Sequence, residues 1–429
     1  MKASVATFKH IARHLLGLDY TDDVALPPTQ RYGLRLLYYD GALALFSEAA
    51  INNYTNLFLV ALQASNAQIG LLGTLSQAFA ALAPLPAALL AERSKAYRLH
   101  IVLPNFIARL GFILLAALPL LPLGQFAAIV AIWLLAGRAF AASWSTAPWT
   151  AFVGQLVPLE LRARYFAARN FLGGLATITG TLIAGQVIST LGFPLGYQVV
   201  FILSLAIGLA ASWTFWRIPA PPQGGTGARD PVAQAVAHWF SQIWDIVSPR
   251  RIFGRYLWCG CALAFAVNIG GPFIQVYQVR ELGFAAGTIG ILVSLEQVVN
   301  ILAQRVYGTF VFAKLGELRA MKVLRFSTAL VPLAWIFVRD PLAAVPVVML
   351  AGTIWSGHEL ANFNNVLRFT PEHRRASFVA VQTFAVSVCA AAGPALGGVL
   401  SELIGYQALF GLSAVLRVLA AAMLVAMVR

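Results

Sequence analysis

The sequence predicts an all-α membrane protein of about twelve transmembrane helices, arranged in two pseudo-symmetric six-helix bundles. First, 59% of the residues are hydrophobic and 11% are charged, with a mean hydropathy of +0.77, which is more apolar surface than a soluble domain can bury. Second, apolar runs of about 20 residues recur, and each can cross a membrane core. Third, the two halves of the chain repeat each other. Spans in lipid must satisfy their own backbone hydrogen bonds, so we expect helices, and the unbroken runs exclude the alternating pattern of a membrane β-barrel.

The apolar runs define six predicted spans in each half of the chain. Those of the first half are 35–62, 67–90, 100–121, 125–153, 166–191 and 198–217. Those of the second half are 255–279, 286–312, 321–338, 341–366, 377–400 and 408–428. Pro84, Pro86 and Pro148 lie inside spans, where proline is tolerated and often marks a bend.

The loops between the spans predict the orientation of the chain. Loops on one side are basic, with Arg93, Lys95, Arg98, Arg162, Arg164, Lys314, Arg319, Lys322, Arg374 and Arg375. Loops on the other side, at 63–68, 124–125 and 192–198, contain no Lys or Arg, and only Arg280 and Arg339 break the pattern. Because basic loops stay in the cytoplasm, we expect a protein of the cytoplasmic (inner) membrane with both termini inside. The net charge of +14 is then explained by anionic lipid rather than by nucleic acid.

Two segments outside the spans complete the predicted domain organisation. Residues 1–32 form a cytoplasmic N-terminal segment, in which Val5, Phe8, Ile11 and Leu15 recur at helical spacing. This pattern is typical of a short amphipathic helix on the inner leaflet, and a solvated segment is the alternative. Residues 218–254 form a cytoplasmic linker that begins rich in Pro and Gly and continues as an amphipathic helix. The two bundles are then residues 33–217 and 255–429.

The internal repeat supports the division into bundles. The segment GYQVVF at 196–201 recurs as GYQALF at 405–410, each directly before the last span of its half. Residues 69–75 match 289–295, and residues 165–168 match 377–380. Matches in the same order at corresponding places indicate a parallel repeat of two six-span units with a cleft between them.

Several of these segments resemble motifs of the major facilitator superfamily of secondary transporters. Gly137-Arg138-Ala139-Phe140 is similar to the family's span-four motif, and Lys314-Leu315-Gly316 to its basic loop motif. The resemblance covers residues 33–429. It implies a secondary transporter that works by alternating access, with spans one, four, seven and ten around a central cavity. Residues 180–185 lack the proline of the antiporter motif, which speaks against a drug/proton antiporter.

Polar residues inside the spans are the candidate site residues, because charges in lipid are costly unless they face a wet cavity or a partner. Span one carries Asp40, Glu48, Asn52 and Asn56 at four- and eight-residue steps, which predicts a polar stripe on one helix face. The stripe either lines a cavity or makes helix–helix hydrogen bonds.

Spans four, seven, eight and ten carry the other candidates. These are Arg138 and Trp144 in span four, Asn268 and Gln275 in span seven, Glu296 and Asn300 in span eight, and Trp355, His358, Glu359 and Asn362 in span ten. Glu296 serves either as a proton site or as an ion-pair partner. The resemblance implicates Arg138 in proton coupling, and a static ion pair with Glu48 or Asp40 is the alternative. His358 titrates near physiological pH or bonds a carbonyl. Trp144 stacks on substrate or packs against helices.

Glu92, Arg93, Arg162, Arg164, Lys314 and Arg374 are candidate gating residues, whose ion pairs would break as the bundles move. Topology alone would also explain these charges.

We therefore predict a secondary active transporter of a small organic solute, coupled to protons, and not an enzyme. Its expected partners are the solute, membrane lipids and protons, and it is expected to be a monomer. No metal spacing or cofactor motif is visible, and Cys259, Cys261 and Cys389 are interpreted as small apolar residues. A non-transporting sensor or assembly factor of the same fold, or a lipid flippase, is the alternative.

Overall fold

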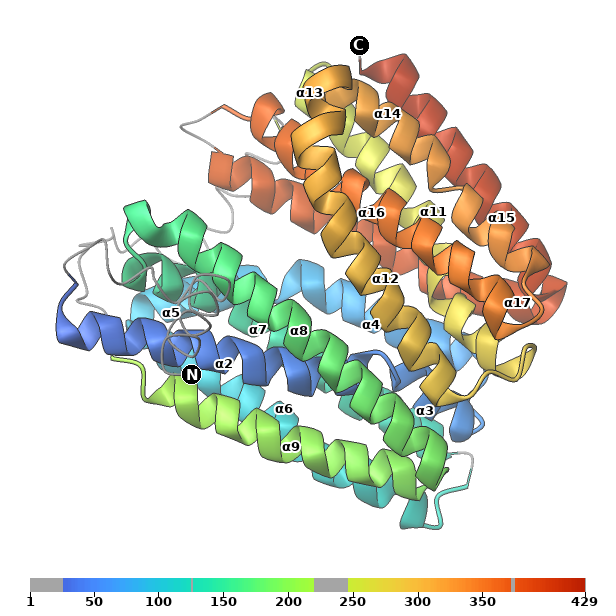
Figure 1. Cartoon of the computed structure of the whole chain (residues 1–429), viewed down its shortest axis with the longest axis horizontal. Helices are drawn as coiled ribbons and strands as arrows, with labels where there is room; N and C mark the ends of the chain where they lie inside the picture. The colour runs from blue at the N-terminus through green and yellow to red at the C-terminus, as the bar shows by residue number, and fades with distance from the viewer. Residues whose placement is uncertain (1–25, 125, 220–245, 372–374, 429) are drawn as a thin grey trace, which may run out of the picture. The chain divides into compact units, whose positions relative to one another are not determined.

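The computed structural model describes residues 26–124, 126–219, 246–371 and 375–428, and every regular element in them is helical. The predicted N-terminal helix, most of the predicted linker helix and Arg374 lie outside the described residues. Figure 1 shows the helices in chain order. Those of the first half are α2 (Pro28–Asn52), α3 (Thr55–Ala61), α4 (Asn66–Leu82), α5 (Pro84–Ser94), α6 (Tyr97–Ala117), η2 (Leu118–Leu120), α7 (Phe126–Leu156), α8 (Leu159–Leu191) and α9 (Leu195–Trp216).

The second half begins with a long helix and contains one π-helical turn, η3. Its elements are α11 (Ile252–Arg280), α12 (Ala286–Val306), η3 (Tyr307–Val311), α13 (Phe312–Leu315), α14 (Glu317–Ser327), α15 (Leu330–Phe337), α16 (Pro341–Phe369) and α17 (Arg375–Met427). The helix α17 contains both of the last predicted spans. They are separated at Gly405, whose φ of 80° is not helical.

The membrane-spanning character of the fold is confirmed. Within the described residues, nine helices are long and apolar enough to cross a membrane, and the pair α4 and α5, bent by 41°, makes a tenth. The helix α2 is outside this set because Arg31, Arg35, Asp40 and Glu48 make it less apolar. Since α17 holds two predicted spans, the structure agrees approximately with the expected twelve.

Local sequence signals explain where several helices begin and bend. Ser65 accepts a hydrogen bond from the backbone N–H of Gln68, whose side chain in turn accepts one from Ser65, so a capping box starts α4. Asp340 accepts from the backbone N–H of Ala343 at the start of α16. The bend between α4 and α5 falls at Pro84, because proline cannot donate to the helix ladder.

The chain forms two compact units. The first consists of Met1–Tyr54, Pro84–Leu121 and Ala141–Gly227. In it, α2 packs against α8 and α9, and α6 packs against α9. Its core is formed by residues of α2, α7, α8 and α9, among them Leu34, Leu37, Phe152, Tyr165 and Phe215.

The second unit consists of Thr55–Ala83, Pro122–Phe140 and Ala228–Arg429. In it, α17 packs against α11 and α4, and α12 packs against α16. A buried cluster that includes Phe253, Tyr256, Met321, Phe378 and Leu424 forms part of its core.

The two units do not follow the predicted domain boundary, because α3, α4 and the beginning of α7 pack with the second half of the chain. The division into bundles 33–217 and 255–429 follows the internal repeat and stays a prediction.

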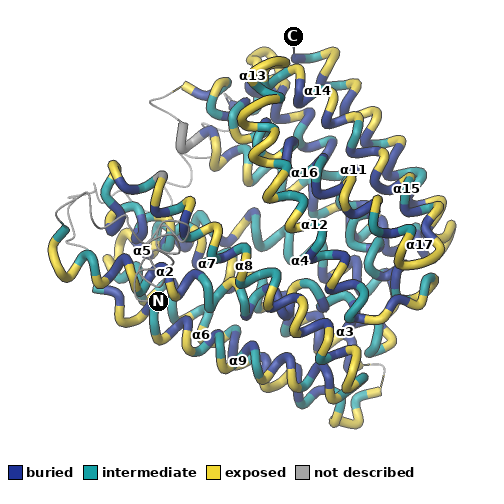
Figure 2. Tube along the Cα trace, viewed as in Figure 1, coloured by how far each residue is buried: buried dark blue, intermediate teal, exposed yellow. Residues whose placement is uncertain are grey.

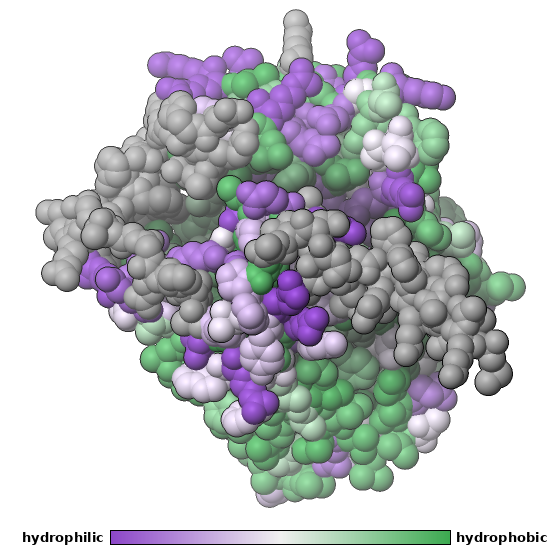
Figure 3. Space-filling view, turned by 60° about the vertical axis from the view of Figure 1, so that its left-hand side comes forward, coloured by the Kyte–Doolittle hydropathy of each residue, from purple (hydrophilic) through white to green (hydrophobic). Residues whose placement is uncertain are grey.

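Large hydrophobic side chains are exposed along many helices, including Trp133, Trp213, Phe337 and Leu342. Figure 2 shows exposed positions recurring along the helices, and Figure 3 shows broad hydrophobic areas on the visible face. Water would disfavour such a surface, whereas lipid accepts it.

Candidate functional site

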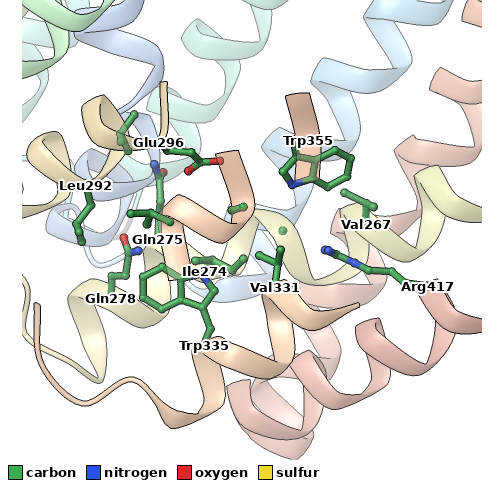
Figure 4. A pocket seen from close by; sticks show the side chains of 14 residues that line it. Val267, Ile274, Gln275, Gln278, Leu292, Glu296, Val331, Trp335, Trp355 and Arg417 are labelled. Atoms are coloured by element: carbon green, nitrogen blue, oxygen red, sulfur yellow. The ribbon is translucent and has the colours of Figure 1, made fainter. Parts of the chain in front are cut away.

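The second unit contains a cavity of about 320 Å³ between α11, α12, α15, α16 and α17. Three of the predicted site residues, Gln275, Glu296 and Trp355, line this cavity (Figure 4). They come from spans seven, eight and ten, which lie far apart in sequence. The other lining residues are Val267, Gly271, Ile274, Gln278, Leu292, Val293, Val331, Trp335, Val348, Ala351 and Arg417. The cavity is therefore mostly apolar, with aromatic and aliphatic walls and the polar side chains of Gln275, Gln278, Glu296 and Arg417, as small-molecule sites commonly are.

The charged groups of the cavity are incompletely satisfied. Glu296 is partly buried, and its carboxyl makes no hydrogen bond or ion pair with the described residues. Arg417 is 2% exposed, and its Nη1 donates to the carbonyl oxygen of Thr328 at 2.8 Å. Its buried Nε has no hydrogen-bond partner within the described part of the chain, and the same holds for Oε1 of Gln278. Buried polar groups in proteins are normally paired, so these atoms have hydrogen-bonding capacity that water or a ligand can satisfy.

The other predicted residues of span ten do not line the cavity. The ring of His358 contacts that of Trp355 edge-on, with centroids 5.4 Å apart, and its buried Nε2 has no hydrogen-bond partner among the described residues. Glu359 is exposed and interacts electrostatically with Glu296. Asn362 accepts a hydrogen bond of 2.7 Å from the hydroxyl of Tyr256, which ties α16 to α11.

The amides of spans one and seven make helix–helix contacts in the second unit. Asn56 donates to the carbonyl of Pro272 at 3.3 Å and to Oε1 of Gln275 at 3.4 Å. Asn268 donates to the carbonyl of Ala264 and accepts from Gln77 of α4 at 3.5 Å. Such bonds join neighbouring helices in lipid.

Arg138 and Asn300, also in the second unit, do not line the cavity. Arg138 is partly buried on α7. Asn300 is partly buried on α12, where the backbone approaches α16 at Gly352: a Cβ there would lie 2.6 Å from the carbonyl oxygen of Glu296. Small residues allow such close helix packing.

In the first unit, Asp40 belongs to a buried charged cluster. It is 7% exposed on α2 and interacts electrostatically with Arg109 of α6 and Arg169 of α8. Arg109 is also 7% exposed and bonds the hydroxyl of Ser212. The guanidinium of Arg169 lies over the ring of Trp149 at 4.9 Å. The Asp40 carboxyl is thus beside two arginines, and neither of them is Arg138.

The predicted polar stripe of span one is interrupted. The helix α2 ends at Asn52, and Asn56 lies in the next helix, α3, which begins at Thr55 and belongs to the other compact unit. Glu48 is partly buried, whereas Asn52 is exposed and donates to the Glu48 carboxylate at 3.4 Å. The idea of one continuous polar face from Asp40 to Asn56 is therefore wrong. Trp144, in the first unit, stacks on His100 with centroids 6.3 Å apart.

The gating candidates have different surroundings. Glu92, Arg93, Arg164 and Lys314 are exposed. Arg162 donates to the carbonyls of Gly154 and Val157, so it satisfies the free end of α7. Arg374 lies outside the described residues, and a gating role of this set stays a prediction.

Within the described residues, three buried arginines were not among the predicted site residues: Arg109, Arg325 and Arg417. Each interrupts one apolar run: Arg109 in span three, Arg325 in span nine and Arg417 in span twelve. A charge inside an apolar run is the sequence signal that could have identified these residues. Arg325 is 1% exposed and lies over the ring of Tyr256 at 5.3 Å. Within the described residues, no group of three or more His, Cys, Asp or Glu side chains could hold a metal ion.

The fold and the cavity define a multi-pass helical membrane protein with a mostly apolar pocket among its spans, into which a few polar side chains point. The model of the Major Facilitator Superfamily matches residues 41–388, so the chain belongs to this superfamily of membrane transporters. No curated protein sequence matches the chain significantly.

Solved transporter structures share the fold. A mutant of the nucleoside transporter NupG is 15% identical, with a TM-score of 0.71, and the match covers 92% of this chain and all 100% of that one. A bacterial homologue of the human lysosomal transporter Spinster is 16% identical, with coverages of 94% and 97% and a TM-score of 0.71. A POT family transporter in complex with 5-aminolevulinic acid is 13% identical, with coverages of 92% and 95% and a TM-score of 0.71.

Proposed function

We propose that the protein is a secondary active transporter that moves a small organic solute across the cytoplasmic membrane by alternating access, coupled to protons. The observation that carries the proposal is the cavity of the second unit, in which an unpaired carboxyl and a buried guanidinium face a pocket inside the membrane-spanning region. A charge in lipid needs a partner or water, so a structural role alone would leave the cavity and its unsatisfied groups unexplained. The structural neighbours that carry a nucleoside or hold 5-aminolevulinic acid support a small organic solute.

Contacts at the outer ends of the helices support alternating access. Arg280 of α11 bonds the carbonyl of Ala64 and donates to Oδ1 of Asn66 at 2.6 Å. The hydroxyl of Tyr406 donates to the same oxygen at 2.9 Å, and Glu402 accepts from the backbone N–H of Ala67 at 3.0 Å. We name these residues around the start of α4 the outer clasp. It joins span two to spans seven, eleven and twelve, and it must open if a solute enters from the outside.

The outer clasp also explains why Arg280 lies on the side that otherwise lacks basic residues. Its guanidinium is used for backbone and amide contacts, and Arg339 likewise donates to the carbonyls of Ile336 and Val338 at the end of α15. Both arginines therefore make structural contacts on the proposed outer side. Their presence there is compatible with the proposed orientation, in which both termini are cytoplasmic.

Single cysteines at Glu281 and Ser94, which are both exposed, are expected to label on opposite sides of the membrane. The measurement uses a membrane-impermeant maleimide on intact cells, in a background where Cys259, Cys261 and Cys389 are replaced by alanine. Glu281→Cys should react without permeabilisation and Ser94→Cys only after it. Labelling of both positions from the outside contradicts the proposed orientation.

Transport itself is tested with purified protein in proteoliposomes. A panel of labelled organic solutes is screened for counterflow, and the best solute is then measured with an imposed pH gradient and no sodium. We expect accumulation that follows the pH gradient and disappears with a protonophore. Counterflow without accumulation contradicts proton coupling, and no counterflow for any solute favours the sensor or assembly factor of the same fold.

A further inference from the structure

Arg417 is a buried cation without a counter-ion in the described part of the chain. Its guanidinium donates to the neutral carbonyl of Thr328, and no acidic side chain of the described residues pairs with it. An unpaired charge away from water is strongly unfavourable, because desolvation is not repaid. A guanidinium that lines a cavity with a free Nε therefore offers donors to an anion, and a carboxylate matches the spacing of those donors.

Glu296 presents the opposite charge to the same cavity. It forms no ion pair with the described residues, and its electrostatic neighbour Glu359 has the same sign and cannot neutralise it. Figure 4 shows Glu296 and Arg417 on opposite sides of the cavity, with side chains such as Ile274 and Val331 between them. The two groups do not satisfy each other, so each is available to a ligand.

The walls between the two charges set the character of the ligand. Trp335 and Trp355 provide aromatic surfaces, and Val267, Ile274 and Val331 provide aliphatic ones. The amide of Gln275 and the unpaired Oε1 of Gln278 add hydrogen-bonding positions. A volume of about 320 Å³ is at the small end for ligand sites, which run from roughly 300 to 1,000 Å³. The space fits a short, mostly apolar chain with a charge at each end.

We infer that this cavity binds a short zwitterion, whose carboxylate lies on Arg417 and whose ammonium group lies on Glu296. This inference rests on the proposed function and names the solute class of the same site. One molecule then neutralises both buried charges, and its uncharged middle lies between the two tryptophans. In this assignment Glu296 binds the solute, and the coupling proton is carried by Glu48, His358 or Glu359.

The first test uses ligands alone on the wild-type chain. Purified full-length protein is titrated with γ-aminobutyrate, δ-aminovalerate and ε-aminohexanoate, and with the matching carboxylates and amines that lack one charge. Binding is followed by tryptophan fluorescence and by the shift in thermal unfolding. At least one zwitterion is expected to bind about tenfold or more tightly than both of its one-charge analogues, since each analogue leaves one buried charge unpaired. Equal binding of a zwitterion and its carboxylate, or no binding by any of the series, overturns the inference.

The second test assigns each charge to its residue. Arg417→Gln is expected to abolish the preference for the zwitterion over the amine, and Glu296→Gln its preference over the carboxylate. Arg417→Lys keeps the cation and should retain part of the preference, which separates the loss of charge from the loss of the Thr328 contact. Arg305→Gln and Glu281→Gln, at exposed positions, are the matched controls and should bind as wild type. Preferences that are unchanged in Arg417→Gln and Glu296→Gln overturn the assignment.

The assignment of the binding site and the proposed transport function can be refuted independently of each other. If the zwitterion binds with both preferences but no pH gradient drives its uptake, the proposed function fails and the site assignment stands. If another solute accumulates with the pH gradient while zwitterions neither bind nor compete, the transporter stands and the inference fails.

Discussion

Gly398→Ala is expected to disrupt the packing of α17 against α4 and to destabilise the protein by about 1–3 kcal/mol. A Cβ at this position would lie 2.5 Å from the carbonyl oxygen of Asn66 and 2.9 Å from Cα of Ala67. Both neighbours are backbone atoms, so no side chain can move aside to make room. On the facing side of α4 lies Gly70, where a Cβ would meet the carbonyl of Pro394 of α17. The two helices can approach closely only because both positions lack side chains.

Gly411→Ala, on the part of α17 beyond the break at Gly405, is the matched control. Apart from its chain neighbours and the backbone of its own helix, a Cβ there has no heavy atom within 4 Å, and alanine also favours helix over glycine. This variant should therefore unfold at the wild-type temperature or slightly above it.

The effect of Gly398→Ala is measured in two ways. Thermal unfolding of the purified protein reports the stability, and cross-linking of Thr74→Cys with Ala391→Cys reports the contact, because Thr74 donates to the carbonyl of Ala391 at 2.8 Å. Both unfolding temperature and cross-linking yield should fall in Gly398→Ala. If the two glycine variants behave alike, close packing at the outer clasp is not what joins these helices.

The helical fold could be predicted because the membrane imposes it. Apolar runs of sufficient length have few alternatives to helix in lipid, and the predicted spans correspond to observed helices throughout. The break between α2 and α3 could not be predicted. The segment Asn52–Asn53–Tyr54 contains no Gly or Pro, and the break is stabilised by tertiary contacts: Asn53 donates to the hydroxyl of Thr181, and Tyr54 donates to the Thr181 carbonyl, each at 2.7 Å. A sequence pattern does not show such partners.

The candidate site was predictable in part for a related reason. Charges inside apolar runs are costly, so Glu296 and Asp40 could be identified from their position alone. Their surroundings depend on which helices are neighbours. Asp40 lies beside Arg109 and Arg169, and Glu296 shares a cavity with Arg417. Basic residues in the spans carry the same cost as acids, and giving them equal weight would have identified Arg109 and Arg417.

Neutralising Asp40 and neutralising Glu48, the two carboxyls of α2, are expected to have different effects: the first on stability and the second on transport. Asp40→Asn removes the charge that offsets Arg109 and Arg169 in a buried cluster. Removing one charge from a buried cluster leaves the opposite charges uncompensated, which is destabilising, so this variant should show reduced yield and a lower unfolding temperature. Adding Arg169→Gln should restore part of the loss, since the double variant has one fewer unpaired charge and neighbouring sites do not add.

Glu48→Gln is expected to leave stability nearly unchanged and to remove the response to the pH gradient. Glu48 is only partly buried near the end of α2, whereas Asp40 is 7% exposed, so neutralising Glu48 is expected to cost less stability than neutralising Asp40. If Glu48 carries the proton, glutamine cannot titrate, and accumulation driven by the gradient should stop while solute counterflow continues. Counterflow and accumulation are measured in the same proteoliposomes, with unfolding temperature as the stability control. Accumulation at the wild-type level in Glu48→Gln would return Glu48 to a structural role. Loss of both counterflow and accumulation would indicate that Glu48 binds solute rather than couples transport to protons. Loss of a residue that only carries the proton should stop accumulation and leave counterflow intact.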